Sequence, residues 1–282
     1  MFSKITVLGA GTMGHGIAHV CAMAGYRVVL YDISAAVLEN AMNSITANLN
    51  KGIAIGKVSE AGRNLTLSNI STSDHLSTAV ANSELIIEAV PENLELKRSL
   101  LAQVDQLTEE STIIGTNTSS ISISEIATAV SDPTRVIGLH FFNPVHVMKL
   151  LEIVYHPTTG NDVIGAMKEF ACAIKKTSIL VKNSPGFATS RLGVLLGMEA
   201  IRMLQEGVAT AEDIDTAMVL GYKHPVGPLK LTDMVGLDVR MAIGSYLAAE
   251  LNQPAFEPPR LMRELVEQGK LGKKSGEGFY RW

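Results

Sequence analysis

The chain has 282 residues, 46% of them hydrophobic and 18% charged, which is enough for one large or two medium domains with real cores. Its net charge of −4 supplies no basic field for nucleic acid or an anionic membrane, so we expect neither partner, and an anionic ligand needs a local patch. The two cysteines lack CxxC spacing, and neither a long apolar run nor an export signal is evident, so we expect a cytoplasmic protein without a disulfide scaffold, zinc ribbon or membrane span.

The first segment has the pattern of a dinucleotide-binding βαβ unit. A β-branched strand at 4–8 leads into the glycine-rich loop 9–14 (GAGTMG), a helical pattern to about residue 24, and a second strand at 26–31. The first glycine allows the tight turn, the second lets the backbone approach a pyrophosphate, and the third allows close packing of helix on strand. The phosphates bind at the helix N-terminus, where unpaired N–H groups and the helix dipole favour anions. We expect cofactor contacts from Gly9, Gly11, Thr12, Met13 and Gly14.

Asp32, at the end of the second strand, indicates the type of nucleotide. It follows the glycines by about twenty residues, where a carboxylate accepts hydrogen bonds from the ribose hydroxyls. The carboxylate would repel a 2′-phosphate, and no arginine follows it at 33–35, so the sequence favours NAD over NADP. A glycine-rich turn without a ligand is the weaker alternative, because strand, helix and acid are all in place.

The next stretch holds histidines and lysines that admit two interpretations. His15 and His19 lie one helical turn apart, a spacing that can bind metal. No third ligand is evident, so we expect a partly buried helix surface and no metal. Ser34 is the expected N-cap of a helix that runs to about residue 51. The basic segment at the end of that helix, which the sequence alone favours as a solvated helix end, contains Lys51, Lys57 and Arg63.

Two polar clusters follow strands of the predicted sheet, at the point where each strand ends. A strand at 84–90 precedes Glu92 and a helix to about residue 109, and a strand at 112–115 precedes the segment TNTSS at 116–120. Open α/β sheets bind ligands at the carboxyl ends of their strands. The candidates on this geometry are Glu92, Asn117 and Ser119, although each of them taken alone is more often a turn or cap residue.

The stretch 135–155 (RVIGLHFFNPVHVMKLLEIVY) carries the candidate catalytic pair. It predicts two short apolar strands, 135–140 and 149–155, joined by a loop. His140 closes the first strand and Glu152 lies inside the second, so their side chains meet if the register allows. A carboxylate on one imidazole nitrogen fixes the tautomer and makes the other nitrogen a better base for a substrate hydroxyl. The alternative is a structural histidine beside a half-buried glutamate.

The remaining chain changes from an alternating pattern to a helical one. A helix at 162–175 and a strand at 178–181 complete an α/β, Rossmann-type, doubly wound and mostly parallel sheet over residues 1–183. After a break at 183–186 we expect an all-helical C-terminal domain, 184–282, that contributes to the substrate cleft and to dimerisation. Its helix at 191–205 is apolar nearly all round, which favours a symmetric homodimer.

Local patterns within the helical part are weaker. Thr210 and Asp213 form a capping-box-like helix start. The tail 269–280 has glycines and closing aromatic residues that indicate an ordered segment packed back onto the domain. The acids that we expect at helix ends or on the surface, with no ligand spacing, are Asp213, Asp215, Asp233 and Asp238.

Together these segments resemble the L-3-hydroxyacyl-CoA dehydrogenase family, closest to its short bacterial 3-hydroxybutyryl-CoA dehydrogenase members. The matching motifs span essentially the whole chain in the family's order, and GLHFFNP is far more specific than a dinucleotide fingerprint. They are GAGTMGHGIA (9–18), IIEAVPENLELK (86–97), TNTSS (116–120), GLHFFNPVHVMKLLEIV (138–154), SPGF (184–187), EDIDTAM (212–218), GPLKLTDMVGLD (227–238) and GKKSGEGFY (272–280).

The resemblance implies the reversible, NAD-dependent oxidation of a short-chain (S)-3-hydroxyacyl-CoA to a 3-ketoacyl-CoA, with acetoacetyl-CoA as a substrate of the reverse direction. It implies that His140 is the general base, that Glu152 orients it, and that Ser119 hydrogen-bonds the C3 oxygen of the substrate. The further residues that it places by NAD are Asn117, beside the nicotinamide, and Glu92, Lys97 and Lys274.

The resemblance also implies contacts to CoA, and the chain departs from the family at one of the expected substrate contacts. The helical tip around 48–57 would meet the CoA, which favours Asn48 and Lys51 as substrate-binding residues. The family usually has Asn-Arg shortly after PGF, and here Ser190 stands in the place of that asparagine. A hydroxyl is shorter and offers a single donor, so either water fills the gap or Ser119 works more alone.

Three alternatives compete with this interpretation. A β-hydroxyacid dehydrogenase would use a lysine in a GxxGxxxxxK helix, which this sequence lacks, since Lys182 follows a strand. A family relative acting on a sugar acid or another non-CoA 3-hydroxy acid would have no affinity for CoA. A non-enzymatic NAD-binding protein would keep the glycines and Asp32 but would not need both His140 and Glu152, so their joint presence argues for an enzyme.

Overall fold

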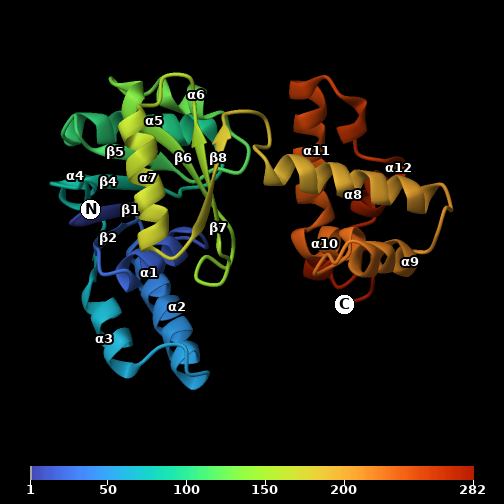
Figure 1. The fold of residues 1–282 in the computed structure, drawn as a ribbon, viewed down its shortest axis with the longest axis horizontal. Helices are drawn as coiled ribbons and strands as arrows, with labels where there is room; N and C mark the ends of the chain where they lie inside the picture. Colours follow the sequence, from blue (N-terminus) through green and yellow to red (C-terminus); the bar gives the residue numbers. More distant parts are fainter. Residues whose placement is uncertain (1) are drawn as a thin grey trace. The chain divides into compact units, whose positions relative to one another are not determined.

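A mostly parallel sheet organises the first of the two units into which the chain divides (Figure 1). The computed structural model describes residues 2–282, and the two units are Met1–Asn183 and Ser184–Trp282. Within the described residues the sheet has eight strands in the order β3-β2-β1-β4-β5-β6-β7-β8, and every neighbouring pair is parallel except β6 and β7. The strands are β1 (Lys4–Leu8), β2 (Arg27–Tyr31), β3 (Ile70–Ser73), β4 (Leu85–Glu88), β5 (Ile113–Thr116), β6 (Val136–Phe141), β7 (Leu150–Tyr155) and β8 (Thr177–Lys182).

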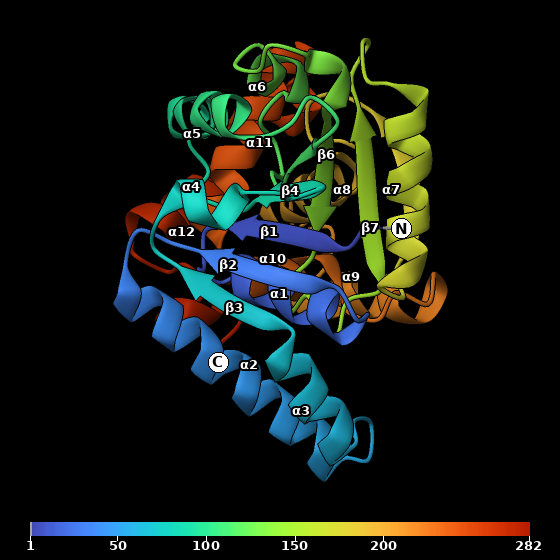
Figure 2. The ribbon, with the colours of Figure 1, turned by 90° about the vertical axis from the view of Figure 1, so that its left-hand side faces the viewer.

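Helices cover this sheet, and Figure 2 shows α7 lying beside β7 at one side of the unit. The central strands are short apolar runs, such as β4 (LIIE), buried along their whole length, as expected for parallel strands enclosed on both faces. In the main core cluster Ile5 and Ile87 from adjacent strands pack with Phe170 of α7. The helices are α1 (Gly14–Met23), α2 (Ala35–Ala54), α3 (Glu60–Ser68), α4 (Leu76–Val80), α5 (Leu94–Leu107), α6 (Ile123–Ala127) and α7 (Asn161–Ala173), with a 3-10 turn η1 (Pro133–Arg135).

The Rossmann-type sheet expected from the sequence is confirmed, with three additional elements between residues 60 and 80. Strand β3 (ISTS), helix α3 and helix α4 precede the strand that the sequence pattern placed third. Three of the four β3 residues are polar, and all four are only partly buried or exposed, because this strand lies at the edge of the sheet. An edge strand of this kind lacks the apolar run by which buried strands are recognised in a sequence.

The second unit is helical and has its own core. Val194 and Met198 of α8 pack with Leu229 and Leu247 of two other helices. Leu192, on the same α8, is 69% exposed, so the apolar helix is not buried all round within one chain. The elements are α8 (Thr189–Gln205), α9 (Ala211–Thr216), the π-helical turn η2 (Ala217–Gly221), α10 (Pro228–Val235), α11 (Leu237–Leu251), η3 (Pro254–Phe256), α12 (Arg260–Glu267) and η4 (Lys273–Ser275).

Two acids of this unit, which were expected at helix ends or on the surface, are buried. Asp233 is completely buried and accepts hydrogen bonds of 2.9 Å from the N–H groups of Phe279 and Tyr280 and from Nε1 of Trp282. Asp215 is 7% exposed and accepts from two N–H groups at the start of α10 and from the Tyr280 hydroxyl. Both acids bind the C-terminal tail, which folds back over the unit and excludes water from them.

Two helix starts have the caps that the sequence indicates. Ser34 Oγ accepts a hydrogen bond from the Val37 N–H at the start of α2. Thr210 Oγ1 accepts from the Asp213 N–H at the start of α9 and donates to the Asp213 carboxylate at 2.8 Å.

Over residues 2–282, no helix is both long enough and apolar enough to cross a bilayer. The same residues contain no cluster of three or more His, Cys, Asp or Glu side chains able to hold a metal ion.

Candidate active site

The glycine-rich loop after β1 is tightly packed at Gly9 and Gly14 and leaves space at Gly11. A Cβ on Gly14 would lie 1.7 Å from the carbonyl oxygen of Gly9, so helix α1 can approach the turn only with glycine there. Gly9 has a φ of +92°, and a Cβ on it would lie 2.8 Å from the Ala89 carbonyl oxygen. By contrast, a Cβ on Gly11 would meet no atom of the described chain within 4 Å. The loop therefore has an open cradle at the helix N-terminus, where a pyrophosphate fits.

Asp32 fixes the next part of a nucleotide site. Its carboxylate stands at the end of β2 and accepts hydrogen bonds from the N–H groups of Ala10, at 2.9 Å, and Ser34, at 3.1 Å. These bonds tie the carboxylate of Asp32 to the glycine-rich loop and fix its position beside that loop. A carboxylate oxygen accepts more than one hydrogen bond, so Asp32 can also accept from ribose hydroxyls.

Alanine at Gly11 and alanine at Gly14 should have different effects: the first should weaken NADH binding, and the second should lower the stability of the fold. In Gly11→Ala the new Cβ enters open space, so we expect the free energy of unfolding to change by less than about 1 kcal/mol. The same Cβ occupies the cradle, so we expect NADH to bind about tenfold more weakly or worse, measured by fluorescence titration. In Gly14→Ala the backbone must move, and we expect a loss of stability of about 1–3 kcal/mol or more. Equal NADH affinity in Gly11→Ala and the native chain would contradict the cradle.

A cleft of about 870 Å³ runs along the carboxyl ends of the central strands. It brings together most of the expected cofactor residues of the first unit and the expected catalytic histidine. Gly14, Lys97 and Glu152 are absent from its lining and lie behind it. The expected site residues that line the cleft are Gly9, Gly11, Thr12, Met13, Asp32, Glu92, Asn117, Ser119 and His140.

His140 and Glu152 are paired across two antiparallel strands. They stand directly opposite each other in the β6–β7 register, so their side chains share one face of the sheet. Nδ1 of His140 lies 2.6 Å from Oε2 of Glu152, and the glutamate is completely buried. The ring also packs on Phe142, with 4.4 Å between ring centroids. The buried carboxylate thus fixes the orientation of the imidazole, whose Nε2 is the nitrogen that a substrate would meet.

Glu92 organises the polar residues after β5. Its Oε1 accepts hydrogen bonds from the Thr118 hydroxyl at 2.5 Å and from the N–H and hydroxyl of Ser119 at 3.0 and 3.3 Å. The expected substrate contact of Ser119 therefore requires its hydroxyl to turn from Glu92 towards the substrate oxygen. Asn117 accepts from the Phe141 N–H through Oδ1, at 3.0 Å, which ties the end of β5 to the end of β6.

Lys97 supports the cleft wall from behind. The side chain is completely buried, and Nζ donates to both carboxylate oxygens of Glu88 at 2.8 and 3.0 Å. Nζ also donates to the carbonyls of Val90 and Asn117, at 3.4 and 3.3 Å, and lies 3.5 Å from Glu92. Lys97 thereby links the segments that follow β4 and β5, whereas its direct contact with NAD stays a prediction.

Glu88 is a site residue that the sequence analysis missed. It ends the apolar strand β4, is completely buried, and also accepts from the Thr116 hydroxyl at 2.5 Å and the Val90 N–H at 2.7 Å. Burial raises the pKa of Glu88, and Lys97, Thr116 and the Val90 N–H oppose that rise. The available signal was an acid inside an apolar run with a lysine nine residues later in the same motif.

The remaining expected site residues lie elsewhere. Asn48 and Lys51, near the end of α2, line a second pocket of the first unit. Ser190 is in the first turn of α8 in the second unit. Lys274, also in the second unit, forms a 2.6 Å ion pair with Asp238. Their contacts with substrate or cofactor stay predictions.

Comparison with known proteins identifies relatives over the whole chain. The family model of the 3-hydroxyacyl-CoA dehydrogenase NAD binding domain matches residues 4–184, and that of the 3-hydroxyacyl-CoA dehydrogenase C-terminal domain matches residues 186–282. The mitochondrial hydroxyacyl-coenzyme A dehydrogenase of Homo sapiens is 41% identical, with 99% of this chain and 90% of the relative covered. The 3-hydroxybutyryl-CoA dehydrogenase of Mycobacterium tuberculosis is 39% identical, with 99% and 98% covered.

A solved structure agrees with these matches. The crystal structure of (S)-3-hydroxybutyryl-CoA dehydrogenase from Ralstonia eutropha superposes with a TM-score of 0.97 at 40% sequence identity. The superposition covers 100% of this chain and 99% of that one. The resemblance inferred from the sequence motifs is thus confirmed at the level of the family.

Proposed function

The chain belongs to the 3-hydroxyacyl-CoA dehydrogenase family, and on that premise we propose that it oxidises short-chain (S)-3-hydroxyacyl-CoA esters, such as 3-hydroxybutyryl-CoA, to 3-keto esters with NAD. The observation that carries the proposal is the 2.6 Å contact of His140 with Glu152, in a cleft that Asp32 and the glycine-rich loop also line. Oxidation of a secondary alcohol removes a proton and a hydride, so one cleft must hold both a base and a hydride acceptor.

In the proposed mechanism His140 is the general base. Its Nε2 takes the proton of the substrate's C3 hydroxyl, while Glu152 on Nδ1 keeps the ring oriented and stabilises the imidazolium that forms. NAD, when bound, supplies the acceptor for the hydride that leaves C3. In the reverse direction the protonated ring would return the proton to the keto oxygen, and NADH, when bound, would supply the hydride to C3.

We propose that the polar segment after β5 positions the reacting groups. Ser119 would donate to the C3 oxygen after turning from Glu92, and Asn117 would border the nicotinamide. Glu92, held by Thr118 and near Lys97, would keep this segment ordered along the NAD site. Supporting this arrangement, the three proposed contact residues line the same cleft as His140.

We propose that the CoA end of the substrate binds at the second pocket, where Asn48 and Lys51 lie. Amide and ammonium groups donate hydrogen bonds to phosphate oxygens, and CoA carries phosphates at its nucleotide end. Ser190 and Lys274, in the second unit, are proposed to contact the acyl portion and NAD, respectively.

The second unit is also proposed to form a homodimer. Leu192, Leu220 and Tyr222 are 69%, 75% and 75% exposed in the single chain, and a second copy would cover large side chains of this kind. Light scattering should give twice the mass of one chain, and the mass of one chain would contradict the proposal. We also propose a cytoplasmic location, because the two cysteines show no disulfide-forming pattern.

The function is tested by following NADH oxidation by absorbance with acetoacetyl-CoA, beside NADPH and beside free acetoacetate. We expect turnover only with NADH and the CoA ester, because Asp32 repels a 2′-phosphate and the second pocket binds the CoA phosphates. Turnover with NADPH would contradict the role of Asp32 and leave His140 unaffected. Equal turnover of free acetoacetate would contradict the need for CoA, and inactivity with short and longer acyl chains would contradict the proposed reaction.

A further inference from the structure

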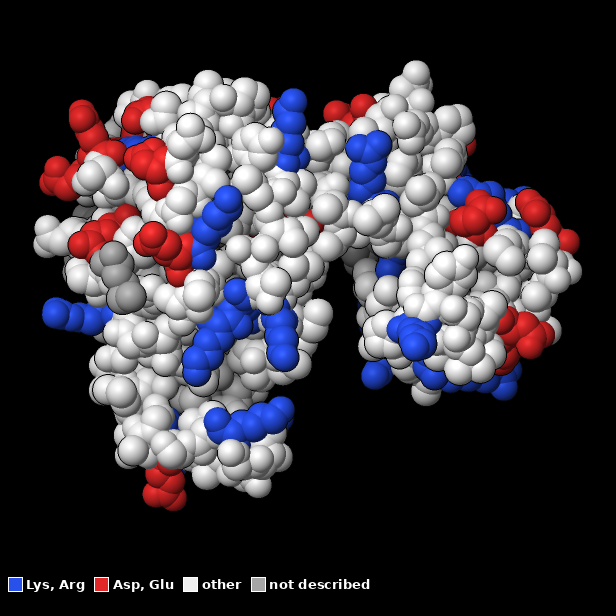
Figure 3. Space-filling view, viewed as in Figure 1, with Lys and Arg blue, Asp and Glu red and all other residues white. Residues whose placement is uncertain are grey.

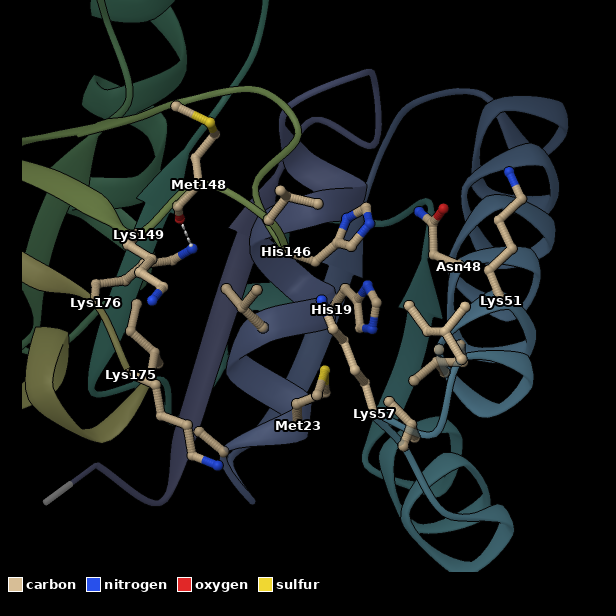
Figure 4. A pocket seen from close by; sticks show the side chains of 18 of the residues that line it. His19, Met23, Asn48, Lys51, Lys57, His146, Met148, Lys149, Lys175 and Lys176 are labelled. Atoms are coloured by element: carbon tan, nitrogen blue, oxygen red, sulfur yellow. Dashed lines mark hydrogen bonds between the residues drawn. The ribbon is translucent and has the colours of Figure 1, made fainter. Parts of the chain in front are cut away.

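The second pocket has a histidine pair at its base. The pocket has a volume of about 440 Å³ and lies between α1, α2, the loop before β7 and the turn between α7 and β8. Figure 4 shows His19 of α1 and His146 of that loop close together, beside Asn48 of α2. We call this cavity, with His19, His146 and the lysines around it, the histidine pocket.

The charged side chains that line the histidine pocket are all basic. Its lining includes no Asp or Glu among residues 2–282, and Figure 3 shows blue side chains gathered on this face of the first unit. Lys176 is held in place, since its Nζ donates to the carbonyls of Val145 and Met148. The lysines that line the pocket are Lys51, Lys57, Lys149, Lys175 and Lys176. The charge of this lining favours an anionic ligand.

His19 has polar atoms that the described chain does not satisfy. The residue is only 2% exposed, and neither Nδ1 nor Nε2 has a hydrogen-bond partner among the described residues. Its ring packs against that of His146, with 5.4 Å between centroids and 32° between planes. A buried imidazole without partners is destabilising, and its neutral form carries one N–H donor, so a ligand with an acceptor oxygen in this pocket would satisfy that donor.

The surroundings keep both rings neutral before a ligand arrives. Burial, with smaller contributions from His146 and His15, lowers the pKa of His19 to about 4. Partial burial lowers the pKa of His146, and the nearby His15, Lys176 and Lys51 act in the same direction. The other charged groups that line the pocket, Lys57, Lys149 and Lys175, are also cationic. A phosphate dianion would reverse this balance, because an opposite charge favours the protonated ring.

We propose that the histidine pocket binds a phosphate group of the CoA nucleotide through His146 and His19, and that His146 takes up a proton as the phosphate binds. The inference rests on the proposed function, because CoA is the ligand assigned to the pocket. It adds a role for two histidines on different elements, which become one site only in the folded chain. It also makes substrate affinity depend on pH at a place separate from the proposed catalytic base.

The sign of that dependence follows from linkage. A group whose pKa is higher in the complex than in the free protein takes up a proton on binding, so affinity falls as pH rises between the two values. The free-state pKa of His146 lies below the ordinary 6.5, so the window begins below pH 6.5 and extends upward. A phosphate monoester, with a second pKa of about 6, acts in the opposite direction when it is partly protonated. At pH 7.2 it is more than about nine-tenths dianionic, and the histidine effect is isolated.

The test is titration calorimetry of CoA into the full chain at pH 7.2, in buffers of different ionisation enthalpy. We expect about half a proton or more to be taken up per CoA bound by the native chain. His146→Gln keeps a polar side chain at an exposed position but cannot titrate, so we expect uptake close to zero and about three- to tenfold weaker binding. His75→Gln is the matched control, because His75 is 81% exposed and lies outside the pocket. This variant should behave like the native chain.

Steady-state kinetics locate the effect. His146→Gln should raise the KM for acetoacetyl-CoA about three- to tenfold relative to the native chain. With acetoacetyl-pantetheine, which lacks the nucleotide, the variant and the native chain should have the same KM. Turnover of acetoacetyl-CoA without proton uptake, or with equal uptake in His146→Gln, would overturn the inference and leave the proposed function standing. A chain that neither binds CoA nor turns over its esters would overturn the proposed function and this inference with it.

Discussion

His140→Gln is expected to bind NADH as tightly as the native chain and to lower turnover of 3-hydroxybutyryl-CoA by about 10²–10⁴-fold, the usual contribution of a general base. The imidazole is the only proposed proton acceptor of the mechanism, and an amide at this position cannot take up a proton. The cofactor residues Asp32 and Gly11 lie on other strands and loops, so the nucleotide part of the cleft is preserved. NADH fluorescence titration and the absorbance assay measure the two properties separately.

Two companion variants distinguish a catalytic role from a structural one. His156→Gln changes another buried histidine, whose Nε2 contacts the carbonyls of Pro133 and Val136, so stability should fall while turnover of the folded fraction is kept. Glu152→Gln should move the acid limb of the oxidation rate to lower pH, because an amide no longer stabilises the protonated ring. Near-normal turnover in His140→Gln would rule out the assignment, and a pH-independent loss in Glu152→Gln would indicate a structural carboxylate.

Lys97→Met is expected to destabilise the first unit by about 3–5 kcal/mol, which corresponds to a melting temperature about 6–20 °C lower. The change leaves Glu88 buried without its cation, since both side chains are completely buried and Nζ contacts both carboxylate oxygens. Calorimetric melting at neutral pH measures the effect. A shift below about 2 °C would contradict the importance of this pair.

The pH dependence of this variant has a definite sign. Burial already raises the pKa of Glu88, and removing Lys97 removes the largest opposing contribution. A carboxyl group whose pKa is raised on folding destabilises the folded state as pH rises from the unfolded value, about 4.3, through the folded one. The deficit of Lys97→Met should therefore be smaller at pH 5 than at pH 8. Adding Glu88→Gln to Lys97→Met should restore most of the stability at both pH values, because no buried charge remains.

The features that sequence predicted well are those encoded locally. The loop 9–14 and Asp32 are separated along the chain by one helix and one strand, so their order alone places them at one sheet edge. His140 and Glu152 lie on consecutive strands, and their contact depended only on the register that the structure then showed. The fold class follows from the same alternation of strands and helices.

The features that sequence did not predict depend on partners distant in the chain. Asp233 looks like a surface acid until the tail, 46 residues further on, donates its Phe279 N–H. The burial of His19 depends on the loop that carries His146, more than a hundred residues later, and helical spacing to His15 gave no hint of that contact. Glu88 was missed because it ends an apolar strand, and the lysine nine residues later does not by itself show that it is buried against this acid.

The hairpin formed by β6 and β7 holds residues of two separate sites. Its hydrogen-bonded ladder sets the distance from His140 to Glu152, and a slip of one residue would turn the glutamate to the opposite face. The loop between these strands carries His146, which belongs to the wall of another pocket. On the proposed roles, substitutions in the loop should alter binding in the second pocket, while the ladder keeps the geometry of His140 and Glu152. An exchange of this loop alone is therefore expected to change the affinity of the second pocket and to leave the contact of His140 with Glu152 unchanged.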